Sequence, residues 1–212
     1  MEKYVIFDFN GTLLDDVKLG LELINEFLLH QNKEVLDIDT YKDIFFFFFK
    51  DYYIKAGLDL ERDKFEDLAL IYNDKYMKRS LSCTLFNDVL EVLKELKDNG
   101  YKLVVLSSSE YNNLVYQLKY YNIYDYFDNV LGTSNYEGNS KTEIGYNFIS
   151  ENSINPSDII CIGDTIHDYE VAMRLGAKSI LVSRGHQSEK KLKEKDAIIV
   201  SNLKTILERN LI

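Results

Sequence analysis

The sequence predicts an α/β protein in which a doubly wound parallel sheet carries an inserted α-helical cap. Three observations predict this fold class: short apolar runs recur along the chain, helical patterns separate them, and strand-like runs are missing over residues 15–83. Buried parallel strands form continuous apolar runs and are joined by helices, so the alternation indicates a doubly wound sheet. We expect residues 1–14 and 84–212 to form the core domain and residues 15–83 to form the cap.

The strands of the sheet are predicted from short apolar runs. Each run is too short for a typical helix, and most are rich in β-branched or aromatic residues, as expected for strands covered on both faces. They are Tyr4–Phe9, Lys102–Leu106, Asp158–Ile162, Ser179–Val182 and Ala197–Val200.

The helices of the core domain are predicted from helical patterns that end at stop signals. Val89–Asn99 is followed by Gly100 and Tyr169–Leu175 by Gly176, because glycine accepts the left-handed conformation that often ends a helix. A third helix, Thr142–Asn152, precedes Pro156.

The cap is predicted from long amphipathic stretches over Val17–His30, about Thr40–Tyr53, and Leu60–Arg79. The run Phe45–Phe49 lies inside the second stretch. Adjacent rings point all round a helix, so we expect most of them to pack between cap and core, with a ligand-facing aromatic wall as the alternative.

Composition limits the classes of protein. The 212 residues are 46% hydrophobic with one proline, and 35 acidic against 25 basic side chains give a net charge of −10. This charge opposes binding to a phosphate backbone, so we expect no nucleic-acid partner. No apolar run approaches the roughly 18 residues of a membrane span and no leader pattern opens the chain, so we expect a cytoplasmic protein without membrane contact. Cys83 and Cys161 are expected to be buried free thiols.

Polar residues follow several of the predicted strands. Ligand sites of parallel sheets lie at the carboxyl ends of the strands, so these residues are the candidates for a functional site. They comprise Asp8, Asn10 and Thr12 after the first strand, Ser107 and Ser108 after the second, Asp164 and Asp168 after the third, and Lys141 at the start of a helix.

These residues suit the chemistry of a phosphoryl group. The carboxylates Asp8, Asp164 and Asp168 offer the hard oxygens that Mg²⁺ prefers, and without a cation they would repel one another. Asp8 can also attack phosphorus, while Ser107 and Lys141 can supply a donor and a positive charge to the phosphoryl oxygens. Any one of these residues could simply cap a helix, but the joint occurrence in this order favours a catalytic site.

Four segments resemble, in order, the motifs of the haloacid dehalogenase-like hydrolase superfamily: DFNGTLLD, LSSS, SKTE and GDTIHD. The helical insertion resembles the C1 cap of the subfamily that includes phosphoglycolate phosphatase and β-phosphoglucomutase. The resemblance implies a Rossmann-like core, Asp8 as nucleophile and metal ligand, and Mg²⁺ held also by Asp164 and Asp168. It further implies phosphate binding by Ser107, Ser108 and Lys141, and a loop oriented by Thr12.

Asn10 departs from the family pattern. Phosphatases of this family carry an aspartate there, which protonates the leaving oxygen and then activates water. An amide cannot transfer these protons, and the loss should cost roughly 3 to 5 kcal/mol in the barrier for poor leaving groups. The backbone carbonyl of Asn10 can still bind the metal, as the family residue does. Candidate substitutes for the acid are His167, Glu110, Asp15 and Asp16.

Three rival classes fit less well. A P-loop would need glycines where Asn135 and Ser140 stand. A true dehalogenase would not need the Mg²⁺ carboxylates Asp164 and Asp168, and a phosphoaspartate receiver would lack the helical insertion.

The sequence therefore predicts a Mg²⁺-dependent phosphatase-like hydrolase of small phosphorylated metabolites that acts through an aspartyl-phosphate intermediate. A degenerate module that binds a phosphorylated ligand or partner without turnover, and a phosphomutase or phosphotransferase, are the alternatives. We expect the cap to close over the site about hinges near residues 14–16 and 82–86. The sequence predicts neither the substrate nor the oligomeric state.

Overall fold

A computed structural model of the chain describes residues 2–46, 49–133 and 141–212. Phe47 and Phe48 of the aromatic run lie outside the described residues. So do Asn135 and Ser140, on which the comparison with a P-loop depends.

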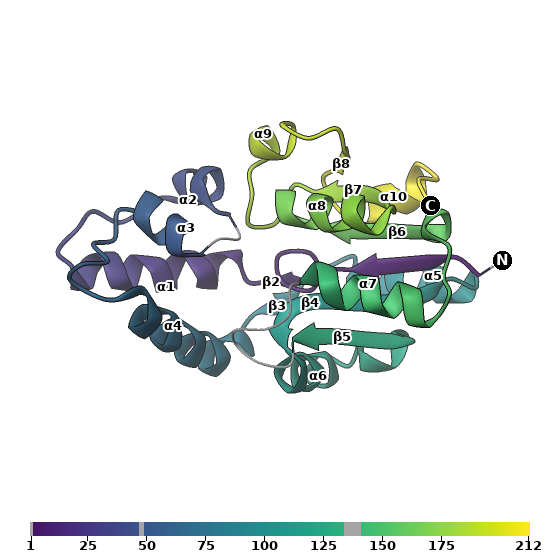
Figure 1. Cartoon of the computed structure of the whole chain (residues 1–212), viewed down its shortest axis with the longest axis horizontal. Coiled ribbons are helices and arrows are strands. Elements are labelled where there is room, and N and C mark those ends of the chain that lie inside the picture. Colours follow the sequence, from purple (N-terminus) through teal and green to yellow (C-terminus); the bar gives the residue numbers. More distant parts are fainter. Residues whose placement is uncertain (1, 47–48, 134–140) are drawn as a thin grey trace.

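The core is a six-stranded parallel sheet in the order β5-β4-β1-β6-β7-β8, which confirms the predicted doubly wound fold (Figure 1). The strands point toward the cap helices, so their carboxyl ends face the cap (Figure 1). The strands are β1 (Tyr4–Phe7), β4 (Lys102–Glu110), β5 (Asn129–Thr133), β6 (Ile159–Gly163), β7 (Lys178–Val182) and β8 (Ile198–Val200).

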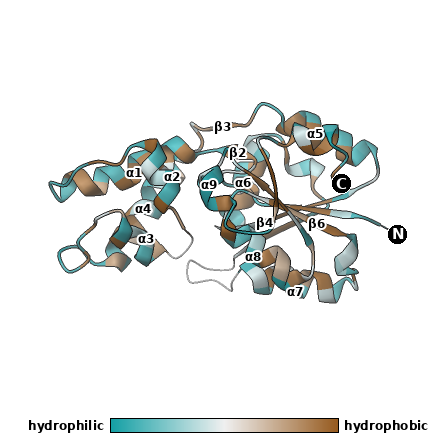
Figure 2. Cartoon of the chain, turned by 90° about the horizontal axis from the view of Figure 1, so that it is seen from above, coloured by the Kyte–Doolittle hydropathy of each residue, from teal (hydrophilic) through white to brown (hydrophobic). Residues whose placement is uncertain are grey.

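Each face of the sheet has its own apolar core. Val5 and Phe7 of β1 pack in one cluster with helices α5 (Val89–Asp98), α6 (Tyr111–Tyr120) and α10 (Lys204–Glu208). Ile6 packs in the other with α7 (Lys141–Glu151) and α8 (Ile166–Leu175). Since successive strand residues point to opposite faces, both faces need apolar residues, which explains the continuous apolar runs. Figure 2 shows these hydrophobic strands between helices of mixed hydropathy.

Two strands differ from the prediction. The edge strand β5 was not predicted, because Asn129, Gly132 and Thr133 leave an apolar run of only two residues. Strand β4 continues through Ser107–Ser109 to Glu110, with a register irregularity against β5 after Leu106. The serine motif therefore lies within the strand rather than beyond its end.

The three predicted core helices agree with α5, α7 and α8 to within about three residues, whereas α6, α9 and α10 were not predicted. Their bounds are α5 (Val89–Asp98), α6 (Tyr111–Tyr120), α7 (Lys141–Glu151), α8 (Ile166–Leu175), α9 (Glu189–Leu192) and α10 (Lys204–Glu208), with 3₁₀ turns at Tyr124–Tyr126 and Pro156–Asp158.

Helices α1 (Val17–His30), α2 (Ile38–Ile44), α3 (Phe49–Lys55) and α4 (Phe65–Ser80) lie together beside the carboxyl ends of the strands (Figure 1). They share an apolar cluster that includes Phe27, Tyr41 and Tyr53. The single helix expected over residues 40–53 is wrong, because α2 ends at Ile44 and Phe45 is extended, with φ −58° and ψ 132°.

The chain enters and leaves these helices through a small antiparallel ladder. Leu14 of β2 (Leu14–Asp15) pairs with Leu85 of β3 (Thr84–Leu85). The two segments that we expect to act as hinges are therefore neighbours joined by backbone hydrogen bonds.

Two further expectations can be compared with the structure. Cys161 is buried, but Cys83 is only partly buried beside β3, so the expectation of two buried thiols is half wrong. None of the helices within residues 2–46, 49–133 and 141–212 is both long and apolar enough to span a membrane.

Candidate active site

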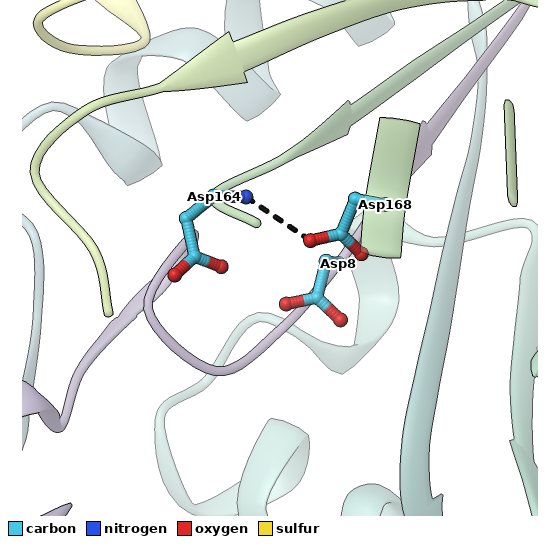
Figure 3. A group of neighbouring side chains, drawn as sticks. All are labelled: Asp8, Asp164 and Asp168. Carbon is cyan, nitrogen blue, oxygen red and sulfur yellow. Dashed lines mark hydrogen bonds between the residues drawn. The ribbon is translucent and has the colours of Figure 1, made fainter. Parts of the chain in front are cut away.

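Three carboxylates meet at the carboxyl end of the sheet (Figure 3). Asp8 follows β1, Asp164 follows β6, and Asp168 lies in the first turn of α8. One oxygen of each lies within 4.8 Å of the others. The backbone N–H of Asp164 donates to Asp168 Oδ2 over 3.2 Å. The predicted cluster therefore forms, although Asp8 lies more than 150 residues before Asp164 and Asp168 in the chain.

Lys141 lies between two of these carboxylates. Its Nζ donates to Asp8 Oδ1 over 2.5 Å and to Asp168 Oδ1 over 2.6 Å, and the side chain is 6% exposed. Burial lowers the pKa of Lys141, but the two carboxylates raise it more, so the ammonium stays charged. This lysine supplies one positive charge to a site with three carboxyl groups.

The buried site carries more negative than positive charge. Burial raises the pKa of Asp8, Lys141 opposes that effect, and the charges of Asp168 and Asp164 raise the pKa further. Burial also raises the pKa of Asp164. A cation bound by these oxygens would relieve the repulsion, and carboxylate oxygens at this spacing suit Mg²⁺. The residues present therefore fit the expected metal ion.

Asp164 is held in place from both sides. Its Oδ1 accepts a hydrogen bond from Thr12 Oγ1 over 3.1 Å, and its Oδ2 accepts one from the backbone N–H of His186 over 2.7 Å. A Cβ atom added to Gly11 would lie 2.4 Å from Oδ2, and one added to Gly185 would lie 2.2 Å from it. Only glycine at these two positions leaves room for the carboxylate.

Asn10 is engaged by the cap as well as by the core. Its Nδ2 donates to Asp16 Oδ2 over 2.9 Å and to the Tyr76 hydroxyl of α4 over 2.5 Å. Its Oδ1 accepts from Ser109 Oγ over 3.2 Å. The Tyr76 hydroxyl itself donates to Asp16 Oδ2 over 2.6 Å. The Asn10 amide therefore faces the Asp16 carboxylate. An ionised carboxylate only accepts hydrogen bonds, so it needs a donor at position 10.

Asp16 and His186 form a buried ion pair, with His186 Nε2 3.1 Å from Asp16 Oδ1. Burial lowers the pKa of His186, but Asp16 and the other nearby carboxylates raise it to about 9. Burial raises the pKa of Asp16, but the charge and hydrogen bond of His186, with those from Tyr76 and Asn10, lower it. His186 also contacts the cap, because its Nδ1 lies 2.8 Å from the Tyr41 hydroxyl.

The two serines expected to bind phosphate lie in the same cavity as Asp8. Ser107 is buried, and its Oγ donates to Ser109 Oγ over 3.2 Å and accepts from the Ser109 N–H over 3.1 Å. Ser108 is partly buried. Their role toward phosphate stays a prediction.

The four candidate substitutes for the missing acid differ in their exposure and in the residues they contact. Asp15 is exposed, and Glu110 caps α6 through the N–H groups of Asn112 and Asn113. His167 lines the cavity from α8. Asp16 is the candidate that forms a hydrogen bond with Asn10.

The cavity above the carboxylates has a volume of about 210 Å³. Phe45, Phe49, Tyr72 and Tyr76 line it from the cap, although we expected the phenylalanine run mostly to pack. Phe45 does pack as expected, against Tyr41 and Tyr52 and stacked on His186 with ring centroids 4.8 Å apart, and it lines the cavity as well.

Sequence reasoning missed His186, Tyr76 and Tyr41. His186 follows β7, so the rule that ligand sites lie at the carboxyl ends of parallel strands would have pointed to it. Tyr76 and Tyr41 lie on cap helices, where tyrosines are numerous and no local pattern separates these two.

Comparison with known proteins places the chain in a family. The model of the haloacid dehalogenase-like hydrolase family matches residues 5–182. The chain belongs to this family, and it is therefore a hydrolase of the haloacid dehalogenase-like type.

Relatives and solved structures agree with that assignment. A phosphoglycolate phosphatase of Psychrobacter arcticus is 24% identical over 196 residues, covering 87% of this chain and 85% of the relative. The tyrosine-protein kinase PtkA of Mycobacterium tuberculosis is 23% identical, covering 96% and 70%. A haloacid dehalogenase-like hydrolase of Streptococcus pneumoniae superposes with a TM-score of 0.77 at 20% identity, covering 99% and 98%. These similarities support the fold.

Gly163, at the end of β6, offers a test of the carboxylate geometry. A Cβ added there would lie 2.3 Å from both Cβ and Cγ of Asp168. Gly163→Ala should displace that carboxylate and lower the affinity for Mg²⁺ by roughly tenfold or more, as for other disruptions around metal ligands. Isothermal calorimetry with MgCl₂ measures the effect. Gly100→Ala is the control, because φ is +81° there with no neighbour within 4 Å, so it should reduce stability without changing Mg²⁺ affinity.

The Asp16–His186 pair predicts how stability depends on pH. The pKa of His186 is about 9 in the folded chain and about 6.5 when unfolded, so its contribution is complete below pH 6.5 and is lost as the pH rises through 9. Urea unfolding of the metal-free protein in chelator should therefore show stability falling by up to a few kcal/mol between pH 7 and pH 10. In His186→Gln this part of the decline should disappear; an unchanged slope would contradict the pairing.

Proposed function

We propose that the protein is a Mg²⁺-dependent phosphatase of small phosphorylated metabolites that acts through an aspartyl-phosphate on Asp8. The observation that carries the proposal is Asp8 itself, whose carboxylate lies against Lys141 in a cavity with two further carboxylates. The family membership and the relative named as a phosphoglycolate phosphatase support the same reaction class.

The metal ligands in this proposal are the carboxylates of Asp8, Asp164 and Asp168, with the backbone carbonyl of Asn10. When bound, Mg²⁺ would neutralise charge on the carboxylates and on the phosphoryl oxygens.

The chain's own residues perform the covalent steps. Asp8 attacks phosphorus with one carboxylate oxygen, and the ester P–O bond breaks as the leaving oxygen takes the bonding electrons. Lys141 and the Ser107 hydroxyl would donate to the phosphoryl oxygens and stabilise the charge that develops there. Water then attacks the aspartyl-phosphate, which releases inorganic phosphate and restores Asp8.

Proton transfer is the weak step of this site. Asn10 cannot protonate the leaving oxygen or accept a proton from water. Asp16 is the nearest substitute, because it is held ionised by His186 and forms a hydrogen bond with Asn10. An ionised carboxylate can accept a proton from water, but it has none to give to a leaving group.

Movement of residues 15–83 against the rest of the chain would admit the substrate. Much of the contact between α2 and the loop after β7 is polar: Lys42 Nζ donates to Arg184 O over 3.1 Å, and Gln187 Nε2 donates to Phe45 O over 2.8 Å. Polar groups of this kind can exchange partners with water when they separate, as interdomain contacts often do. The paired segments β2 and β3 would act as the hinge.

Phosphoryl transfer to an acceptor other than water is the second candidate. Without a carboxylate at position 10 to activate water, the aspartyl-phosphate should persist longer, and one relative is named as a tyrosine-protein kinase. Addition of alcohol acceptors during turnover would distinguish transfer from hydrolysis by the product formed.

The first prediction from the proposed function concerns Asp8. Asp8→Asn should abolish turnover of acetyl phosphate in the presence of Mg²⁺, because an amide is not a nucleophile for this reaction. Release of inorganic phosphate is the measurement, and Asp98→Asn, at an exposed position on α5 away from the cavity, is the control. Activity in Asp8→Asn beyond a trace would refute the nucleophile. If the unaltered protein binds phosphate analogues but never releases phosphate, the non-catalytic binding module is the correct reading.

The second prediction concerns Asn10. Asn10→Asp would place two carboxyl groups within hydrogen-bond distance, at the present 2.9 Å separation from Asp16. Such a pair retains a proton at higher pH, which would supply a general acid. Rates for glucose 6-phosphate should therefore rise by about 10²-fold, a typical general-acid contribution, and more than those for phenyl phosphate.

The companion variant is Asp16→Asn, which should slow hydrolysis if Asp16 accepts the proton from water. Because Asn10-Gly11 is prone to deamidation, mass spectrometry of the peptide must verify Asn10 before any rate is compared. Equal rates for both substrates that neither variant alters would place the acid elsewhere.

A further inference from the structure

The cavity of the site has two unlike sides. Its floor, from the core, carries Asp8, Asp164, Asp168 and Lys141, and the lining from residues 15–83 consists of four aromatic side chains with Asp16 and Asn73. Phe45 and Phe49 come from the junction of α2 and α3, whereas Tyr72 and Tyr76 come from α4. The Tyr72 and Tyr76 rings are parallel to within 8°. A phosphoryl group on the floor would thus place the leaving group among rings from two separate elements.

The aromatic side offers no positive charge to a leaving group. Among the lining residues that the structure describes, Lys141 contacts Asp8 and Asp168, His186 is paired with Asp16, and His167 lies on the floor at α8. The segments outside the described residues contain no lysine, arginine or histidine in their sequence. A carboxylate or second phosphate on the leaving group would therefore lose water without gaining a cation, which is costly.

The volume of the cavity limits the size of the substrate. An apolar cavity of about 150 Å³ holds one benzene molecule in a well-studied protein. The 210 Å³ here therefore suits a phosphoryl group with one ring. A larger substrate would have to extend out of the cavity into solvent.

The chemistry of position 10 favours the same class independently. Without an acid, the leaving oxygen must depart as an anion, and a phenolic oxygen does so far more readily than an alkyl one because its conjugate acid is stronger. Aromatic walls also stabilise a flat ring by stacking and edge contacts.

We propose that this site selects phosphate monoesters of small, uncharged aromatic alcohols with a single ring. The inference rests on the proposed function and specifies its substrate class. In the reaction, an Asp8 oxygen forms a bond to phosphorus, the aryl ester P–O bond breaks, and the phenolate leaves with the electron pair and is protonated by solvent. Water then releases inorganic phosphate from Asp8.

The substrate test compares four phosphates with the Mg²⁺-loaded protein: phenyl phosphate, acetyl phosphate, phosphoglycolate and glucose 6-phosphate. We expect kcat/KM for phenyl phosphate to exceed that for phosphoglycolate and glucose 6-phosphate by at least tenfold. Acetyl phosphate has a good leaving group but no ring, so its rate of hydrolysis measures the covalent steps without a contribution from the aromatic side chains. Hydrolysis of phosphoglycolate or glucose 6-phosphate as efficient as that of phenyl phosphate would overturn the substrate class and leave the phosphatase proposal intact.

The aromatic wall, which consists of Phe45, Phe49, Tyr72 and Tyr76, is tested by two variants. Phe49→Leu removes a ring from α3, and Tyr72→Leu removes one from α4. Phe49 is 41% exposed, so its replacement should leave the fold intact. Each variant should raise KM for phenyl phosphate by roughly threefold to tenfold, the range expected for an aromatic contact, with a much smaller change for acetyl phosphate. Ile71→Leu, at an exposed neighbour on α4, is the matched control and should change neither. Equal effects on both substrates would refute the wall as a selective element.

A binding measurement separates failure of the proposed substrate class from failure of catalysis. If none of the four phosphates is hydrolysed, the proposed function fails, and calorimetry with phenylphosphonate and methylphosphonate still tests the wall. Binding of phenylphosphonate at least tenfold tighter than methylphosphonate, weakened by Phe49→Leu, supports the substrate class. Equal binding of the two phosphonates refutes it.

Discussion

The gathering of three carboxylates in a largely buried site is the constraint on which the rest of this structure depends. Like charges at this spacing repel, and burial removes the water that would screen them. The structure answers with Lys141, which contacts Asp8 and Asp168, and with donors from Thr12 and the His186 backbone to Asp164. Two glycines leave room for the Asp164 carboxylate. Most features at this end of the sheet therefore serve to hold negative charge where a cation and a phosphoryl group would use it.

A second charged pair links the two parts of the chain. Asp16 lies just after β2, and it receives hydrogen bonds from Asn10, Tyr76 and His186, which belong to three different segments. Tyr76 comes from the cap helix α4, and His186 also contacts Tyr41 of α2. Because buried charge is stable only while its partners are present, this pair favours the arrangement in which cap helices cover the carboxylates.

The fold and the metal-type site were largely predictable, for a physical reason. Strands covered on both faces must be apolar throughout, and the site residues stand at the ends of such strands, so both can be read locally. The edge strand β5 was not predicted because Asn129, Gly132 and Thr133 interrupt its apolar run. The end of α2 at Ile44 was not predicted, because the aromatic residues that follow occur in helices and in extended chain alike.

Contacts between distant segments could not be predicted in the same way. Asp16, Tyr76 and His186 meet only because helix α4 and the loop after β7 both lie against residue 16, and no local pattern encodes that contact. Asp16 was a candidate by its nearness to Asn10 in sequence, but its partner His186 lies 170 residues away.

These contacts change how the departure at position 10 is understood. Taken alone, an asparagine in place of the family's aspartate is the loss of an acid. In the structure the amide donates to an ionised carboxylate that His186 holds in that state, so a donor is what the surroundings require. A carboxylate at position 10 would meet Asp16 as a like charge, and one of the two would have to keep its proton. The effects of substitutions at residues 10, 16 and 186 on stability and activity should therefore not add, because each substitution changes the charge or hydrogen bond that the other two residues contact. The departure is a property of this coupled set, and its consequence for catalysis depends on all three residues together.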